Sequence, residues 1–485
     1  MSTPTAPARP GARAAQSLGA VVGFLVAVEL ASGVLQGYYT PIYSDIADRL
    51  AISDADVNWF EAAQLLVSAL CVPPLARLAD VWGHQRVLVL ATAVTALASW
   101  AVAFAPSFGT FLVAWALQGF YVVWLPLEVA IIHRRTAGTG RQDVLTRRAA
   151  AVLVGALEVA VIIGALTSGV LVTAIGMTGL LALPAVVVTL VLVAIWFGVE
   201  HVPGEARGGH DLGGLGLLTT LLLLVMGGLI ALRLLGPASP WPWLLVAVGL
   251  GLLVPFVCRE RGHREPIVDV RLLASRGQWP VQLTAFLFGM SVLGAQIPLS
   301  TFARTDPAVA GYGLGADAAF VSVLIGVYVL CMAAGALTLP LTTALLGPRG
   351  SLVAAAVLVA IGYGLFVPLH DGSVQVLVNM GVAGLGSGAL VAALPAAAAA
   401  AAPPGRTGFA TGMTNATKTV GGAIASAVFA IALASTGSLE GPDLGHAALA
   451  GYLVVWSVCA VAALLAAASL LLLPTRVVEN TAAGQ

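Results

Sequence analysis

Long apolar runs with almost no charged residues recur along this chain of 485 residues. Each run is about 20 residues long, the length with which an α-helix crosses the hydrocarbon core of a bilayer. A membrane β-barrel would show short strands of alternating polarity, and none is evident. The sequence therefore predicts an all-α integral membrane protein with fourteen transmembrane helices, at 18–38, 57–75, 85–105, 108–132, 149–174, 178–198, 212–235, 241–258, 280–300, 318–340, 350–369, 373–400, 409–434 and 447–473.

Composition excludes several other classes of protein. Hydrophobic residues make up 59% of the chain and charged residues 9%, and the net charge is zero, so no overall field attracts nucleic acid. The four cysteines lie in apolar runs without the spacing of a disulfide or metal site. The seven histidines lie in connections or at span ends, and there is no Walker-type phosphate loop. We therefore expect no enzyme, no cofactor, no bound metal and no channel.

The positive charges predict the topology. Cytoplasmic connections of membrane proteins are enriched in Arg and Lys. With the first connection inside, eighteen of the 22 basic residues fall on the cytoplasmic side; Arg49, Arg233 and Arg304 fall outside, and Lys418 lies within a span. One helix more or fewer would place many of these basic residues on the opposite side of the membrane. We therefore expect fourteen spans with both termini in the cytoplasm.

The fifth and thirteenth predicted spans, which are eight spans apart, contain the same spacing between two glycines. Gly155 and Gly164 in the fifth span match Gly412 and Gly421 in the thirteenth, and we expect all four to pack helices together. This repeat predicts two six-helix bundles with two inserted helices. The domains would be a cytoplasmic tail at 1–17, a bundle at 18–200, linker helices and a connection at 201–279, a bundle at 280–474 and a tail at 475–485.

Three ionisable residues lie deep within the predicted spans. Glu29, Glu158 and Lys418 are each about 13–17 Å from the cytoplasmic end of their helix, close to the bilayer midplane. Charges at this depth are costly and mark transport pathways, unless they form a structural ion pair. If Lys418 pairs with one acid, the other is free to bind and release a proton. Glu29 and Glu158 are therefore the two candidates for proton coupling.

Other polar or aromatic residues lie within the spans. Some will bond to neighbouring helices and others could line a substrate cavity. Glu61 and Glu128 fall near span ends, where an interfacial role is expected, and Pro126 predicts a kink. The candidates for the cavity are Glu29, Gln64, Trp115, Gln118, Trp124, Asn415 and Lys418.

A short polar connection joins the second and third runs. In Leu75–Arg86, Asp80 lies where one apolar run ends, and Gly83, three residues later, permits a sharp turn. The residues Leu78, Ala79, Asp80 and Gly83 resemble the signature loop of the major facilitator superfamily, and Arg86 retains one of its positive charges. The resemblance implies the major facilitator fold. It also implies a conformational switch at Asp80, Gly83 and Arg86, in which the aspartate contacts a helix of the opposite half.

Further residues resemble the fourteen-helix drug:proton antiporter branch of that superfamily, in which the first helix lines the cavity. Three regions fit the branch. Between the first and third helices the matching residues are Pro41, Ile46, Ala47, Leu50, Trp59, Leu65, Pro73 and Pro74. The loop before the ninth helix is 266–272, and the matching residues of the thirteenth helix are Gly412, Asn415, Lys418, Gly421 and Gly422.

The chain also departs from the branch. Trp115 stands where the family has the arginine linked to proton coupling, and Ser32 where the first span often has Asp. Glu29 lies one helical turn before Ser32, on the same face. In the antiporter motif of the fifth span, Gly155 and Gly164 are kept, but the Gly-Pro pair is replaced by Ser168-Gly169. These departures bear on transport direction and coupling rather than on the fold.

The resemblance implies a secondary transporter of the cell membrane. We expect a monomer in the lipid bilayer that exports hydrophobic or amphiphilic small molecules, such as drugs or natural antibiotics, in exchange for protons by alternating access. The alternative is a solute importer or an uncoupled facilitator of the same fold.

Overall fold

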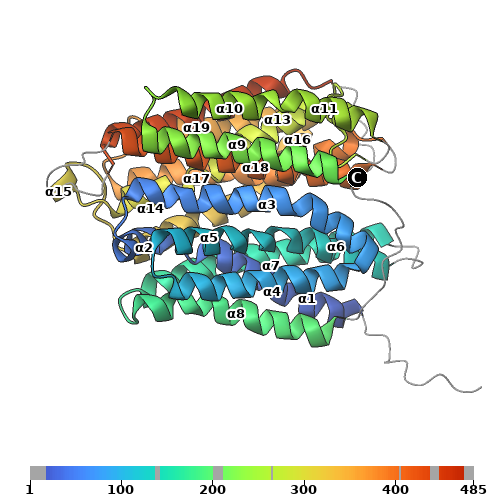
Figure 1. Cartoon of the computed structure of the whole chain (residues 1–485), viewed down its shortest axis with the longest axis horizontal. Helices are drawn as coiled ribbons and strands as arrows, with labels where there is room; N and C mark the ends of the chain where they lie inside the picture. Colours follow the sequence, from blue (N-terminus) through green and yellow to red (C-terminus); the bar gives the residue numbers. More distant parts are fainter. Residues whose placement is uncertain are drawn as a thin grey trace, which may run out of the picture.

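The computed structural model describes residues 18–136, 142–199, 211–263, 266–403, 406–436 and 447–474. The predicted tails, 1–17 and 475–485, lie outside the described residues. Every regular element in the described part of the chain is helical. The long helices run side by side along one axis, as expected of a membrane bundle (Figure 1).

The first half of the chain forms one bundle around its own buried core. This core runs from Val21 in the first helix to Val199, directly after the last. The fourth span is broken by a 3-10 segment, Gly119–Val123, shortly before the predicted kink at Pro126. The helices are α1 (Leu18–Gly37), α2 (Tyr43–Leu50), α3 (Asp54–Trp82), α4 (His84–Phe104), α5 (Phe108–Gln118), α6 (Trp124–Arg135), α7 (Gln142–Leu171) and α8 (Met177–Gly198), with a 3-10 turn at Thr40–Ile42.

The inserted segment contains α9 (Leu212–Leu235), α10 (Pro240–Gly251), α11 (Leu253–Gly262) and α12 (Val270–Leu273). Asp211 caps α9 by accepting a hydrogen bond from the Gly214 amide at 2.9 Å, and Arg259 donates to the same carboxylate at 2.6 Å. Burial alone would raise the pKa of Asp211, but these hydrogen bonds hold it below its ordinary value. One carboxylate therefore ties the start of α9 to α11.

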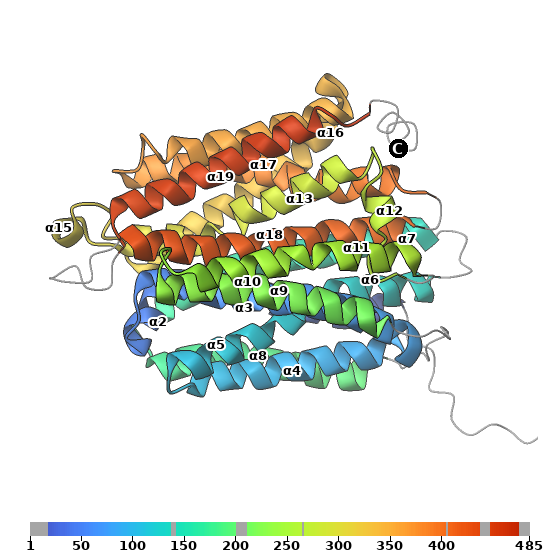
Figure 2. The same ribbon diagram turned by 45° about the horizontal axis from the view of Figure 1, so that its top comes forward.

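The second half of the chain forms the other bundle, around a second buried core that extends to Leu473. Its helices are α13 (Trp279–Val292), α14 (Gln296–Arg304), α15 (Pro307–Ala310), α16 (Ala318–Leu365), α17 (Ser373–Ala400), α18 (Thr407–Thr436) and α19 (Leu449–Leu470). In Figure 2, α9 and α10 lie over the region where α3 of the first bundle meets α18 of the second.

The helix α16 contains two crossings. Its 48 residues would extend about 72 Å, more than twice the thickness of the hydrocarbon core. Gly347 has φ 70°, ψ 165° and precedes Pro348, so the helix is interrupted there. Among the described residues, twelve helices are long and apolar enough to span a membrane; α16 counts once, and α3, with 29 residues, is not among them. This is compatible with the fourteen predicted spans, and the number itself stays a prediction.

Ion pairs join connections that the charge pattern places on one side of the membrane. Arg304 pairs with Asp45 at 3.0 Å and Arg233 with Asp56 at 3.3 Å, all four residues near ends predicted to face outside. Arg406 pairs with Asp269 at 2.8 Å between two connections predicted to be cytoplasmic. These pairs agree with the order in which the predicted spans cross.

The polar connection between α3 and α4 turns at one residue. Gly83 ends α3 and begins α4 with φ 99°, a backbone conformation that favours glycine. Trp82 and Arg86 on either side are exposed. The side chain of Asp80 lies outside the described residues, so its predicted contact with the opposite half stays a prediction.

Candidate functional site in the helix bundles

The two bundles are joined at the end predicted to face outside. Ser300 donates a hydrogen bond to the carbonyl of Thr40, Ser322 donates to the carbonyl of Ala165 at 2.7 Å, and Arg304 pairs with Asp45. Ile297 and Ala318 of the second half belong to the buried core of the first. These contacts close this end against solvent.

The four glycines predicted to pack helices divide into two groups. Gly164 lies close to the backbone of α1, and a Cβ on Gly421 would lie 2.1 Å from the Phe286 carbonyl oxygen of α13. Gly155 and Gly412 are instead exposed, with open space beside them. The prediction for these two is corrected: they lie on parts of α7 and α18 where no neighbouring helix is close.

Two other glycines, which the sequence analysis did not single out, position the deep charged residues. A Cβ on Gly33 of α1 would lie 2.2 Å from the carbonyl oxygen of Leu157, the residue before Glu158. A Cβ on Gly289 of α13 would lie 1.9 Å from the carbonyl oxygen of Lys418. Any side chain would separate these helices. Both bundles therefore bring their first helix close to the backbone beside a deep charge.

Glu158 of the first bundle and Lys418 of the second lie close enough for the charge of each to act on the other. Glu158 is on α7 and Lys418 on α18, which occupy equivalent places in the two halves. Each is the charged group that acts on the other, although the ion pairs found among the described residues do not include this one. Both side chains are half-buried. An acid of one half thus faces a base of the other.

Glu29 lies inside the first bundle instead. Its side chain is completely buried, and its polar neighbour is the equally buried Glu128 of α6. The expectation of an interfacial role for Glu128 is therefore wrong. Glu128 lies on α6, which follows the 3-10 segment Gly119–Val123 and packs against α1.

Trp115 stands in an aromatic cluster within the first bundle. Its ring lies 4.5 Å from that of Tyr39 and 5.6 Å from those of Phe60 and Phe111, measured between centroids. Stacked and edge-on rings at such distances stabilise a core. The place of the family arginine is thus filled by apolar rings that supply no positive charge for Glu29.

Several residues predicted to line the substrate cavity are buried in this conformation. Gln118 donates hydrogen bonds to the hydroxyls of Tyr39 and Ser99, at 3.1 and 3.0 Å. Trp124 has no exposed surface, and Trp115, Gln64 and Glu29 have little or none. These five do not line an open cavity here. Asn415 and Lys418 on α18 remain half-buried and partly accessible.

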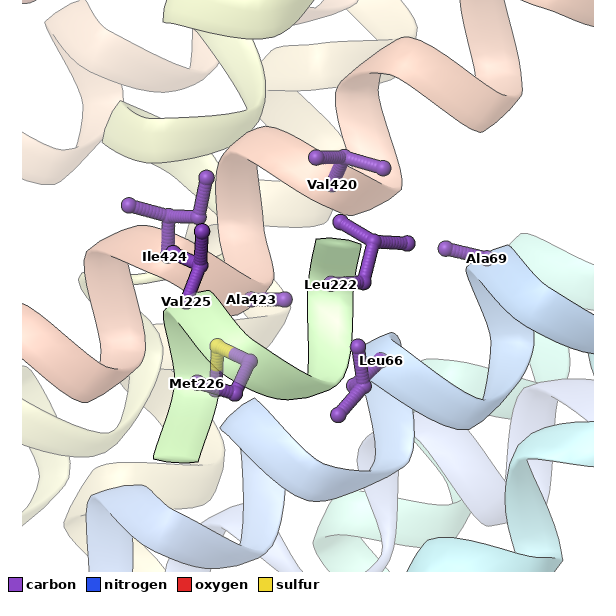
Figure 3. A pocket seen from close by; sticks show the side chains of 8 residues that line it. All are labelled: Leu66, Ala69, Leu222, Val225, Met226, Val420, Ala423 and Ile424. Carbon is purple, nitrogen blue, oxygen red and sulfur yellow. The ribbon is translucent and has the colours of Figure 1, made fainter. Parts of the chain in front are cut away.

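A small apolar hollow lies between α3, α9 and α18 (Figure 3). Its lining has no polar side chain: Leu66 and Ala69 come from α3, Leu222, Val225 and Met226 from α9, and Val420, Ala423 and Ile424 from α18. The hollow has no polar side chain to orient a polar ligand. In the described part of the chain, no three His, Cys, Asp or Glu side chains are grouped to hold a metal ion.

Solved structures share this fold. A POT family peptide transporter aligns over 93% of this chain and 96% of its own, with TM-score 0.65 and 17% identity. A bacterial homolog of the lysosomal transporter Spinster, solved in an inward-facing and unoccupied conformation, aligns over 97% and 99% with TM-score 0.65 and 14% identity. The nucleoside transporter NupG gives TM-score 0.63 at 14% identity, over 93% and 99%.

Sequence comparison gives the family. The multidrug resistance protein Stp of Mycobacterium tuberculosis is 24% identical over 407 residues, which cover 81% of this chain and 71% of that protein. The family profile named Major Facilitator Superfamily matches residues 25–302, more than half of the chain. With its all-helical two-bundle fold, this chain therefore belongs to the Major Facilitator Superfamily.

Proposed function

We propose that this protein exports hydrophobic or amphiphilic small molecules, such as drugs or natural antibiotics, across the cell membrane in exchange for protons. It acts as a monomer with both termini in the cytoplasm. Substrate binds between the two bundles, near Asn415, Lys418 and Glu158. The bundles then rock so that the site opens alternately to the two sides.

The observation that carries this proposal is the arrangement of Glu158 and Lys418. Opposite charges on equivalent helices of the two halves face each other at the seam, where motion of one bundle relative to the other changes their separation. Intramembrane charges are costly and are retained where they serve transport. The conformation supports the same view, because the end predicted to face outside is closed.

The proposed direction of transport, which is export, and the proposed class of substrate rest on the likeness to one relative. The likeness to a multidrug resistance protein favours efflux of lipophilic compounds. An importer or an uncoupled facilitator is the second candidate. It is favoured by Trp115, because the aromatic cluster replaces the arginine that the antiporter branch uses for coupling.

The connection between α3 and α4 is proposed as the conformational switch. Gly83 provides its turn, and Arg86 is exposed beside it. A carboxylate at Asp80 that caps a helix N-terminus of the other half would favour one conformation by about 0.3–1 kcal/mol.

The test is transport in sealed vesicles that hold the purified full chain. An imposed pH gradient, with a panel of lipophilic dyes and antibiotics, should drive accumulation of some compounds against their gradient. The control is the same vesicles with the gradient collapsed by a protonophore. Movement that follows the substrate gradient alone, at equal rates with and without the pH gradient, would support the facilitator instead.

A further inference from the structure

Two carboxyl groups face each other inside the first bundle. Glu29 of α1 and Glu128 of α6 have no exposed surface, and each is the polar neighbour of the other. None of their four oxygens makes a hydrogen bond of ordinary geometry to any group in the described part of the chain. This is the most unusual buried polar arrangement in the first bundle, and the alternating-access mechanism described above leaves Glu128 without a role.

The helices around this pair supply no positive charge that acts on it. The helix α8 contains no titratable residue, and Glu158 of α7 is directed at Lys418 across the seam. The remaining acidic or phenolic groups nearby are Glu61 of α3 and Tyr121 of the 3-10 segment, whose hydroxyl lies within reach of the charges of Glu29 and Glu61.

The basic residues of the adjoining helices lie at helix ends. His133, Arg134 and Arg135 occupy the last turn of α6, and His84 and Arg86 the first turn of α4. Neither these residues nor Arg148 of α7 is among the groups that act on Glu29 or Glu128. In the described part of the chain, no cation therefore neutralises the pair.

Two ionised carboxylates that are adjacent in such a place are strongly destabilised. Each charge loses its hydration, and each repels the other. One proton bound between the oxygens removes the repulsion and lets one carboxyl donate a hydrogen bond to the other, so the two groups titrate as a unit. Uptake of that proton changes the net charge of the pair from −2 to −1.

We propose that Glu29 and Glu128 form one proton-binding site, in which a single shared proton is taken up and released during the transport cycle. This rests on the proposed function and deepens it. It assigns the coupling proton to the first bundle rather than to Glu158, and it gives Glu128 a direct role. A site that needs no arginine is also compatible with the aromatic cluster around Trp115.

Infrared spectroscopy tests the site without any transport. A shared proton gives a carboxylic C=O stretch that titrates with pH and shifts in heavy water. Glu29→Gln and Glu128→Gln should each shift this band, because the remaining carboxyl no longer shares its proton, and the double variant should remove it. Glu61→Gln, the matched acid on the adjoining α3, should leave the band unchanged. A band that is unchanged in Glu128→Gln, or two bands that titrate independently in the unmodified protein, would overturn the proposal. If Glu128→Gln does not fold, Glu128→Asp keeps the acid and should also shift the band.

A double-mutant cycle in vesicles tests the role in transport. Each single Gln variant should lose pH-driven efflux by at least about tenfold, and the double variant should lose no more, because both changes remove one proton. If the loss of pH-driven efflux in the double variant equals the product of the two single losses, the two acids bind protons at separate sites. Exchange of labelled for unlabelled substrate shows whether each variant still moves substrate. Absence of pH-driven efflux in the unmodified protein would remove the proposed antiport, whereas the infrared band still decides whether the pair binds a proton.

Discussion

The two sets of deep charges contrast in sign, location and burial. Glu29 and Glu128 carry like charges, belong to one bundle and are completely buried. Glu158 and Lys418 carry opposite charges, belong to different bundles and are half-buried at the seam. If the bundles rock as proposed, the first pair keeps its geometry, because both acids belong to one bundle, whereas the second pair changes its separation.

This difference separates two tasks within one transporter. A rigid pair of like charges is suited to hold a proton, because the bound proton removes their repulsion. A pair of opposite charges across a moving seam is suited to sense the conformation, since its attraction depends on how close the bundles are. Proton binding and the change of conformation are coupled only if the charge on Glu29 and Glu128 influences which conformation is favoured.

Reversing one charge at the seam should have the largest effect. Lys418→Glu replaces the attraction between the two charges with repulsion between two acids in a partly buried place, and we expect transport to fall about 100-fold. The swapped double variant Glu158→Lys with Lys418→Glu should recover a substantial part of the activity. The measurement is the transport rate in vesicles at equal protein content. If the double variant recovers no activity, the two side chains do not act as a pair.

Neutralising the acids separately should give a smaller effect that differs in kind. Glu29→Gln is expected to lose pH-driven efflux by about tenfold while substrate exchange continues, since only proton binding is removed. Glu158→Gln leaves Lys418 without its partner, and both efflux and exchange should fall. Parallel efflux and exchange assays distinguish the two patterns. Full pH-driven efflux in both variants would mean that neither acid carries the coupling proton.

Loosening the closed end should have the smallest effect. Arg304→Ala removes a partly exposed ion pair between the bundles, which is worth about 0.5–1 kcal/mol, so the population open to the outside should rise about threefold. Spin labels on Asp48→Cys of α2 and Val309→Cys of α15, in a variant without native cysteines, would report the separation. Arg233→Ala is the matched control, because its partner Asp56 lies on α3 and the pair does not join the bundles. An equal shift in both variants would contradict a latch at this end.

The sequence predicts the limits of several helices well and the rotation of each helix about its axis poorly. Runs such as 373–400 and 178–198 nearly coincide with α17 and α8, because burial in lipid demands an uninterrupted apolar helix. The counting that placed Glu29 near the midplane used the same rule. It gave no rotation of one helix relative to another, so the approach of Glu128 to Glu29 was not foreseen.

The error at Glu128 has a local cause. The sequence predicts a kink near Pro126, but it does not indicate that the five residues before α6 adopt a 3-10 conformation, or which side of α6 packs against α1. In the same way, Trp115 and Gln118 were assigned to the cavity as polar or aromatic residues within spans. The structure shows that rings and hydroxyls of their own bundle surround them.

The inserted helix α9 is attached differently to the two bundles. Arg233 holds it to Asp56 of α3 by an ion pair, whereas its described contacts with α18 are apolar, among them Val420, Ile424 and Ala427. Apolar contacts are not directional, so they resist sliding less than an ion pair does. We therefore expect α9 to travel with the first bundle as a sliding seal, which keeps lipid tails out of the seam while α18 moves beneath it.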